Sequence, residues 1–264
     1  MRRHDPRDNP GTVLAAVTFG LLAFLAPAPA VPASAPAGLV PLIPAAAPAP
    51  VALPVQRVVT ITAQPVVLKS SGALRGDPTV SLTFDDGPDP IWTPRVLEVL
   101  RRNAAVATFC VVGEQARKHP ELLREIVDSG MRLCNHTRTH PADVAAAPEP
   151  ERREEIVGAR GELRALVDAP VVYFRAPGGR FSPAVLELAA AQGMQPLGWS
   201  VDLRDWEQPG RLQILTTLER ALRPGAVILM HDGGGGTRAQ TVESLELMLP
   251  WLRESGYRFT FPTP

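Results

Sequence analysis

Two aspartates, Asp85 and Asp86, stand side by side in the segment Ser-Leu-Thr-Phe-Asp-Asp-Gly-Pro, where an apolar run of residues ends. Adjacent carboxylates repel each other, so at least one of them needs a cation or a proton close by. Gly87 and Pro88 follow directly and interrupt the extended segment. The pair is therefore the first place to look for a site, and the rest of the chain can be searched for groups that would share a cation with it.

Two histidines offer such groups. His136 and His140 in Asn-His-Thr-Arg-Thr-His are four residues apart, which predicts two rings on one face of a helical turn, about 6 Å apart along its axis. Histidine pairs with this spacing more often bind no metal when no other ligand accompanies them. Together with one carboxylate of the aspartate pair, this spacing indicates a metal site with an open position for water, as in catalytic zinc sites. The other aspartate would then serve as a general base.

Arg175 follows an apolar segment in Phe-Arg-Ala-Pro-Gly-Gly. We expect it to support the charge of the free aspartate, the alternative being an ordinary surface charge. The glycines after Pro177 allow backbone N–H groups to approach a ligand closely and to bind an oxyanion.

His231 ends the apolar segment 226–230 and is the candidate general acid, although a lone histidine at a strand end is more often structural. Asp205 in Asp-Leu-Arg-Asp-Trp would orient His231 and raise its pKa, and Trp206 would form a wall of the pocket. The alternative for this segment is a polar loop anchored by an indole ring. Together these groups predict metal-assisted hydrolysis of an acyl bond.

The elements that must position these groups follow an alternating pattern. Predicted strands cover residues 79–85, 105–113, 131–136, 171–177, 194–202, 226–232 and 257–261, and predicted helices cover 92–103, 119–130, 150–168, 182–193, 212–222 and 240–256. Such alternation predicts an α/β fold with a parallel sheet or barrel. The ionisable groups fall at the carboxyl ends of strands, where parallel α/β folds build their sites, and this indicates an enzyme.

The N-terminal part has a different composition. A charged start, the apolar run Thr12–Ala26 and small residues after it predict a signal peptide over residues 1–30, with an uncleaved membrane anchor as the alternative. Residues 31–55 are rich in Ala and Pro and predict a disordered linker. A short β-rich lead-in over 56–77 and a catalytic domain over 78–262 complete the expected order. We expect the domain to be secreted or associated with the cell envelope.

The charge balance and the two cysteines add further expectations. Lys plus Arg and Asp plus Glu both number 27, so no basic excess points to nucleic acid or to an anionic membrane. We expect a monomer that contacts a membrane only through an uncleaved anchor. Cys110 and Cys134 end two consecutive predicted strands, and outside the cytoplasm such a pair tends to form a disulfide. The alternative is two small buried apolar residues.

Five segments, in this order and spacing, resemble the five motifs of the polysaccharide deacetylases, or carbohydrate esterase family 4, with the chitooligosaccharide deacetylase homology domain. They are TFDDGP, HTRTH, RAPGG, DLRDW and ILMH, and the resemblance spans roughly Pro78 to Phe261. It implies a distorted parallel (β/α) barrel of about seven strands. It also implies removal of N-acetyl groups from N-acetylglucosamine-containing polysaccharide, peptidoglycan or chitin-type oligomers. Alternatives are an acetyl-xylan esterase on the same scaffold and a non-catalytic relative that only binds glycan.

The resemblance also implies a role for each motif residue. Asp85 would be the general base, held by Arg175, and His231 would be the general acid, with its pKa raised by Asp205. Asp86, His136 and His140 would bind the metal. The Gly178 N–H would bind the oxyanion, and Leu229 and Trp206 would line the acetyl pocket. Zn²⁺ is the expected metal, with Co²⁺ or a similar divalent ion as the alternative. Many members carry an aromatic residue where Gly178 stands, a difference that keeps the backbone donor but removes a ring on which a sugar could stack.

Overall fold

The computed structural model describes residues 63–70 and 78–263. The predicted signal or anchor segment 1–30, the predicted linker 31–55 and most of the lead-in 56–77 lie outside the described residues. Within the described ranges, no helix is long and apolar enough to cross a membrane.

A parallel sheet lies at the centre of the described part. Its strands are β1 (Thr79–Asp85), β2 (Ala107–Val111), β3 (Arg132–Asn135), β4 (Val171–Phe174), β5 (Gln195–Pro196), β6 (Val201–Asp202), β7 (Ala226–His231) and β8 (Arg258–Phe259). Their order across the sheet is β5-β4-β3-β2-β1-β7-β6, with β8 paired to β1. Every pair of these strands is parallel. The predicted distorted parallel α/β barrel is confirmed.

The segment 194–202, predicted as one strand, is divided between the two edges of the sheet. β5 pairs with β4 at one edge, and β6 pairs with β7 at the other. The residues between them use their backbone groups elsewhere: Gly198 N–H donates to the carbonyl of Leu68, and the carbonyls of Leu197 and Gly198 accept from Arg175. The prediction of a continuous strand was therefore wrong. Because the segment serves both edges, it brings them together and curls the sheet.

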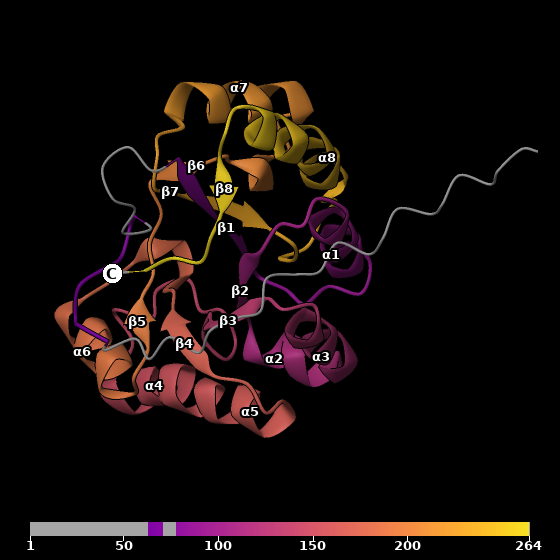
Figure 1. Ribbon diagram of the computed structural model, residues 1–264. Coiled ribbons are helices and arrows are strands. Elements are labelled where there is room, and N and C mark those ends of the chain that lie inside the picture. Colours follow the sequence, from indigo (N-terminus) through magenta and orange to yellow (C-terminus); the bar gives the residue numbers. More distant parts are fainter. Residues whose placement is uncertain (1–62, 71–77, 264) are drawn as a thin grey trace, which may run out of the picture. The chain divides into compact units, whose positions relative to one another are not determined.

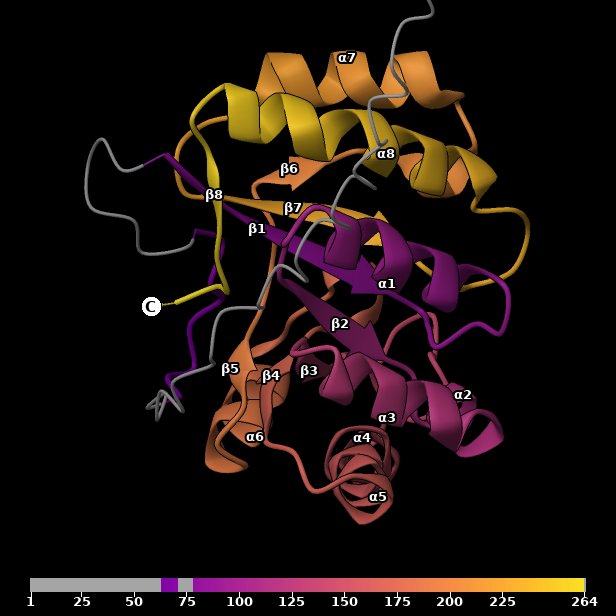
Figure 2. The same cartoon turned by 45° about the vertical axis from the view of Figure 1, so that its right-hand side comes forward.

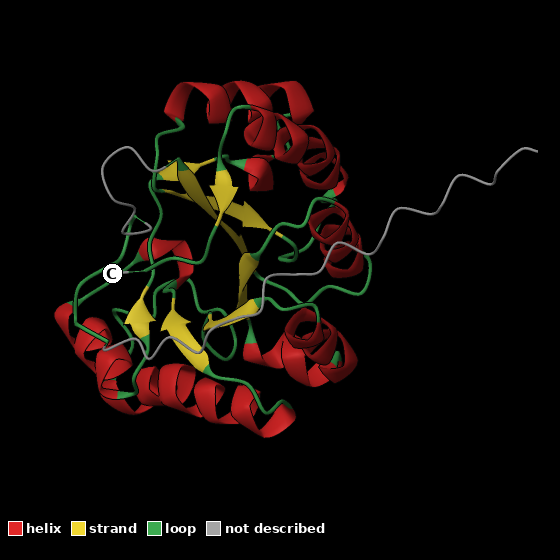
Figure 3. Cartoon of the chain, viewed as in Figure 1, coloured by secondary structure: helices red, strands yellow, loops and turns green. Residues whose placement is uncertain are grey.

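Helices surround the sheet on its outer side (Figure 1 and Figure 3). They are α1 (Trp92–Arg102), α2 (Gly113–Lys118), α3 (Pro120–Asp128), α4 (Glu149–Arg153), α5 (Ala159–Leu166), α6 (Pro183–Ala191), α7 (Arg211–Ala221) and α8 (Ala239–Glu254). A π-helical turn over Glu154–Gly158 joins α4 to α5, in agreement with the single helix predicted over 150–168. The short helix α2 was not predicted, because its sequence carries no clear apolar period.

The central strands of the sheet are buried on both faces. All residues of β1 are buried, and so are all residues of β2. In Figure 2, β7, β1 and β2 lie side by side, with α1 in front of β1 and α8 above β7. Phe84 and Phe109 stack with ring centroids 5.2 Å apart. Burying each such side chain contributes about 1.5–3 kcal/mol, so the strands that end at the candidate site are held firmly.

Candidate metal and catalytic site

The carboxyl ends of β1, β3, β4 and β7 bring the predicted site residues to one rim. The strand register places Asp85 directly opposite His231. A cavity of about 450 Å³ opens at this rim. Most of the predicted residues line it: Asp85, Asp86, His136, His140, Gly178, Trp206, Leu229 and His231. Arg175 and Asp205 lie behind this lining and are completely buried.

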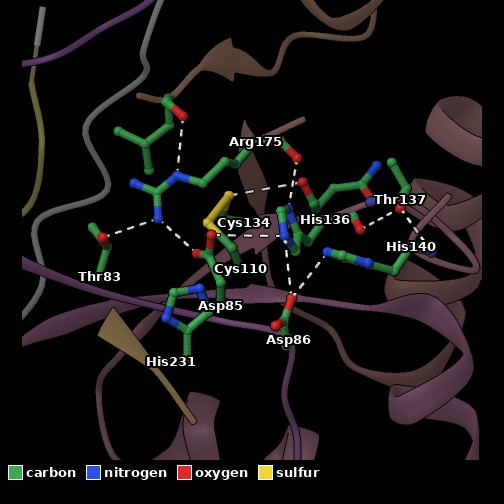
Figure 4. Close-up of polar contacts among 12 residues, drawn as sticks. Thr83, Asp85, Asp86, Cys110, Cys134, His136, Thr137, His140, Arg175 and His231 are labelled. Atoms are coloured by element: carbon green, nitrogen blue, oxygen red, sulfur yellow. Dashed lines mark hydrogen bonds and ion pairs between the residues drawn. A yellow bond between two sulfur atoms is a disulfide. The ribbon is translucent and has the colours of Figure 1, made fainter. Parts of the chain in front are cut away.

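Asp86, His136 and His140 form a cluster that could hold a metal ion. One ligand atom from each lies within 4.8 Å of the others. The Nε2 atoms of His136 and His140 are 3.4 Å and 3.2 Å from Oδ1 of Asp86. Figure 4 shows both rings directed toward this carboxylate. Two imidazoles and one carboxylate facing a common point are the donor set expected at a catalytic zinc-type site.

Two observations test whether these residues fit a cation. The Nδ1 of His136 lies 2.8 Å from the carbonyl oxygen of Arg175. A carbonyl only accepts, so Nδ1 carries the proton and the lone pair of Nε2 faces Asp86. Oδ1 of Asp86 is buried and has no hydrogen-bond partner among the described residues. A lone pair opposite an unpartnered carboxylate oxygen is unfavourable unless a cation lies between them, so the donor set fits a divalent metal.

The electrostatic environment keeps Asp86 ionised. Burial raises the pKa of its carboxyl, but when no metal is bound and the rings of His136 and His140 are protonated, their hydrogen bonds and charge outweigh burial and hold that pKa well below its ordinary value. The reciprocal interaction with Asp86 raises the pKa of His140. An ionised carboxylate is the form that binds a metal.

The two histidines do not share a helical turn, so that prediction was wrong. The loop 136–140 is irregular, with left-handed backbone at Thr137 (φ 68°) and His140 (φ 61°). Side chains hold this loop: Asn135 Oδ1 accepts from Thr137 N–H, Thr137 Oγ1 accepts from His140 N–H, and Glu155 accepts from the backbone N–H of Arg138. Local polar contacts bring the rings together, with centroids 5.0 Å apart.

Asp86 sits in a tight crossing of two loops. Its backbone has φ 75°, in the left-handed region that residues with a Cβ adopt at a cost. The loop after β7 passes directly over Asp86. The approach is so close that a Cβ placed on Gly234 would lie 2.2 Å from Oδ2 of Asp86. Glycine is required at that point for the backbone to approach the carboxylate.

Asp85 is held separately from its neighbour by Arg175. Nη1 of Arg175 donates to Oδ1 of Asp85 at 2.6 Å and to Oγ1 of Thr83 at 3.0 Å. Nε and Nη2 donate to the carbonyls of Leu197 and Gly198, and the guanidinium lies 5.5 Å from the ring centroid of Trp199. Each nitrogen of this buried cation therefore has an acceptor, and the predicted partnership with Asp85 is present in the geometry (Figure 4).

We expect Arg175→Met to lower the free energy of unfolding by about 3–5 kcal/mol, because it leaves the buried Asp85 carboxylate without its cation. Urea denaturation measures this effect. The control is Arg180→Met, since Arg180 is exposed and pairs with Asp143 at the surface; it should cost less than about 1 kcal/mol. Equal small losses in both variants would contradict the role given to the buried pair.

His231 faces the cavity from β7, the strand next to β1, and is held by Asp205. Oδ1 of Asp205 lies 2.7 Å from Nδ1 of His231, and Oδ2 accepts from the His231 backbone N–H and from Oγ1 of Thr241. Burial lowers the pKa of His231, but the hydrogen bond and charge of Asp205 outweigh burial and raise it above its ordinary value. The arrangement therefore favours the protonated form of the imidazole at the cavity.

The cavity walls combine predicted and unpredicted residues. Trp206 is 49% exposed, whereas Leu229 is 4% exposed. Gly178 has φ 58°, and a Cβ there would meet no atom closer than 3.8 Å, so space alone does not require glycine. Sequence reasoning missed three polar or aromatic residues at or beside the cavity: Trp199, Asp232 and Arg238.

Asp232 is the least expected of these residues. It is completely buried, and burial, together with the charges of Asp86 and Asp85, raises its pKa to about 7. Its position directly after His231 at the end of an apolar strand was the signal that could have identified it.

Cys110 and Cys134 are opposite one another on β2 and β3, at the level where these strands reach the site. Both are completely buried, and their sulfur atoms lie at bonding distance. The geometry is compatible with the predicted disulfide.

Comparison with known proteins finds similarity to polysaccharide deacetylases. A family model described as polysaccharide deacetylase matches residues 73–197. The chain is 40% identical over 192 residues to a chitooligosaccharide deacetylase from Sinorhizobium fredii, covering 69% of this chain and 89% of the relative.

Solved structures show the same fold. The Bc1960 peptidoglycan N-acetylglucosamine deacetylase, solved with a hydroxamate-type ligand, 4-naphthalen-1-yl-N-oxidanyl-benzamide, has a TM-score of 0.69 at 33% identity, covering 74% of this chain and 92% of that one. BA3943 from Bacillus anthracis, described as a CE4 family pseudoenzyme, has a TM-score of 0.68 at 28% identity, covering 74% and 67%. From its sequence, its fold and the residues at its rim, this chain belongs to the polysaccharide deacetylase family.

Proposed function

We propose that this protein is a metal-dependent hydrolase that removes N-acetyl groups from N-acetylglucosamine-containing polysaccharide, either peptidoglycan or chitin-type oligomers. The observation that carries the proposal is the division of the aspartate pair. Asp86 faces the rings of His136 and His140, whereas Asp85 is bound at 2.6 Å to a buried guanidinium and meets only one of these rings, that of His136, at 3.6 Å. Neighbouring carboxylates with such different partners are suited to different tasks, one to metal binding and one to proton transfer.

A divalent ion bound by Asp86, His136 and His140 would supply Lewis-acid polarisation of the acyl group and acidification of water. We assign Zn²⁺ first, because two imidazoles and one carboxylate suit it, and Co²⁺ as the alternative. The tautomer set by the carbonyl of Arg175 keeps Nε2 of His136 available for this ion.

The other residues act on the substrate and its protons. Asp85 accepts a proton from the attacking water, and Arg175 holds the Asp85 carboxylate in place. The backbone N–H of Gly178 donates to the developing oxyanion. His231, kept protonated by Asp205, donates a proton to the departing amine. Leu229 and Trp206 form walls for the acetyl group.

The role of His231 predicts a change in pH dependence. Asp205→Asn removes the charge that raises the pKa of His231, while burial continues to lower it. The acid therefore loses its proton at lower pH, so the alkaline limb of the kcat/KM profile shifts toward lower pH. The control is Asp202→Asn, a cavity carboxylate that bonds to the Arg204 N–H. An unchanged alkaline limb in Asp205→Asn, or an equal shift in both variants, would contradict the assignment.

The substrate is tested by measuring acetate release from peptidoglycan, chitin oligomers and acetylated xylan in parallel, with and without added Zn²⁺. The proposal expects release from one or both N-acetylglucosamine polymers, abolished by a chelator. Release from xylan alone would favour an acetyl-xylan esterase. Glycan binding without any release, equal in the wild type and in His136→Ala, would favour a non-catalytic relative, a class exemplified by the pseudoenzyme above.

The remaining proposals concern the setting of the domain. Acetylated polysaccharide is the proposed partner, with no nucleic acid, and we propose a monomer in the cell envelope or secreted space. The N-terminal sequence supports export, and a membrane contact would come only from an uncleaved anchor. A disulfide between Cys110 and Cys134 agrees with this compartment. Mass spectrometry of the exported protein, without reduction, tests the disulfide and the cleavage together.

A further inference from the structure

Asp232 is a buried acid with no part in the steps above. It directly follows His231, and it is completely buried. One carboxylate oxygen, Oδ2, accepts a hydrogen bond of 2.5 Å from Oγ1 of Thr93 in α1. The other, Oδ1, has no hydrogen-bond partner among the described residues. A buried carboxyl without a cationic partner is unfavourable, so its position calls for an explanation.

The contacts of Asp232 converge on the turn that follows β1. Its backbone N–H donates to the carbonyl of Asp85 at 3.1 Å. Its carboxylate packs against Gly87 so closely that a Cβ on Gly87 would lie 2.3 Å from Oδ2. These two contacts lie immediately before and after Asp86 in the chain, so Asp232 holds both ends of the residue that faces the two histidines.

Thr93 extends this support to the far side of the turn. Because its hydroxyl donates to Asp232, its oxygen is free to accept, and it accepts from the Asp89 N–H at 2.7 Å. Oδ1 of Asp89 in turn accepts from the N–H groups of Ile91 and Trp92 at the start of α1. Two consecutive hydrogen bonds therefore link the carboxyl of Asp232, the hydroxyl of Thr93 and the backbone of Asp89.

The turn needs such support because of Asp86 itself. Its left-handed backbone, φ 75°, is unfavourable for a residue with a Cβ and persists only where the surroundings impose it. If the turn relaxed, the Asp86 carboxylate would leave the point at which the rings of His136 and His140 are directed. A metal site depends on this orientation as much as on the ligands themselves.

We propose that Asp232, acting through Thr93, is a positioning residue that fixes the turn carrying Asp86 and so sets the metal affinity of the site. The proposal rests on the metal site of the proposed function but not on the identity of the substrate. It assigns Asp232 no contact with the substrate or with the reacting atoms.

The test is the dissociation constant for Zn²⁺ alone, and separately for Co²⁺, measured on the full chain without substrate. Thr93→Val removes the hydroxyl and is expected to weaken metal binding by about 10-fold, the lower part of the range for loss of an outer-shell partner. Thr93→Ser keeps the hydroxyl and is expected to bind close to the wild type. Asp232→Ala is expected to weaken binding as Thr93→Val does, and Asp232→Asn, which keeps an acceptor, to recover part of the loss.

Matched variants separate positioning from general loss of stability. Leu163→Ala, in the buried face of α5, should lower Tm without changing metal affinity. In the double variant Thr93→Val with Asp232→Ala, the loss of metal affinity should be smaller than the product of the two single losses, because the two side chains share one hydrogen bond. If Asp232→Ala does not fold, the Thr93→Val and Thr93→Ser pair decides the question alone.

The proposal is overturned if Thr93→Val binds both ions as tightly as the wild type, or if Leu163→Ala weakens binding equally. It is also overturned if the wild type binds neither ion. A wild type that binds metal but releases no acetate from any glycan would instead contradict the proposed function and leave this measurement valid.

Discussion

Asp85→Asn is expected to lower kcat for acetate release by about 10²- to 10⁴-fold, the contribution typical of a general base. Asn has nearly the same shape and keeps an oxygen that can accept from Arg175, but it cannot take a proton from water at neutral pH. Asp86, His136 and His140 are unchanged, so the metal content should stay at the wild-type level. The measurement is kcat together with bound metal in the same preparation.

The control for this substitution is Asp143→Asn, which removes a half-buried carboxylate paired with Arg180 outside the cavity. It should leave both kcat and metal content unchanged. Turnover by Asp85→Asn within a factor of ten of the wild type would show that another group is the base. Loss of metal from Asp85→Asn would show that the two aspartates do not have separate tasks.

His136→Ala is expected to have the second large effect, on metal binding. It removes one ring nitrogen from the cluster, so we expect affinity for Zn²⁺ to fall by more than the roughly 10- to 100-fold typical of losing an outer-shell partner. Acetate release should fall with metal occupancy. Calorimetry of the metal-free protein with Zn²⁺ measures the first effect directly.

His119→Ala is the matched control for this variant. His119 lies at the start of α3 beside Glu121, away from the cavity residues. Its replacement should leave metal affinity unchanged. If both histidine variants bind Zn²⁺ as the wild type does, the cluster of Asp86, His136 and His140 is not the metal site.

The architecture followed closely from the sequence. Strands such as β1 and β7 are buried along nearly their whole length, because helices cover one face and the barrel interior the other. That pattern, alternating with amphipathic helices, predicts parallel strands whose carboxyl ends share a rim. The division of 194–202 could not be predicted, because it depends on distant partners: Leu68 and Arg175 take backbone groups that a continuous strand would use.

The site was predicted where adjacent residues carry the chemistry, and missed where folding assembles it. The aspartate pair and the two histidines stand out by type and spacing. The conformation of the loop that joins His136 to His140 could not be predicted, because side chains of Asn135 and Glu155 shape it through contacts with its backbone. Asp232 escaped notice because its partner Thr93 lies far away in the sequence, and the two meet only when folding brings the end of β7 to the start of α1.

The most direct measurement is acetate release from N-acetylglucosamine oligomers during titration of chelated, metal-free protein with Zn²⁺, with bound metal counted in the same samples. We predict no release without metal, a rise in proportion to bound Zn²⁺, and a plateau at a single ion per chain. Full release from the metal-free protein, or no release from any acetylated glycan once the site is filled, would contradict this account.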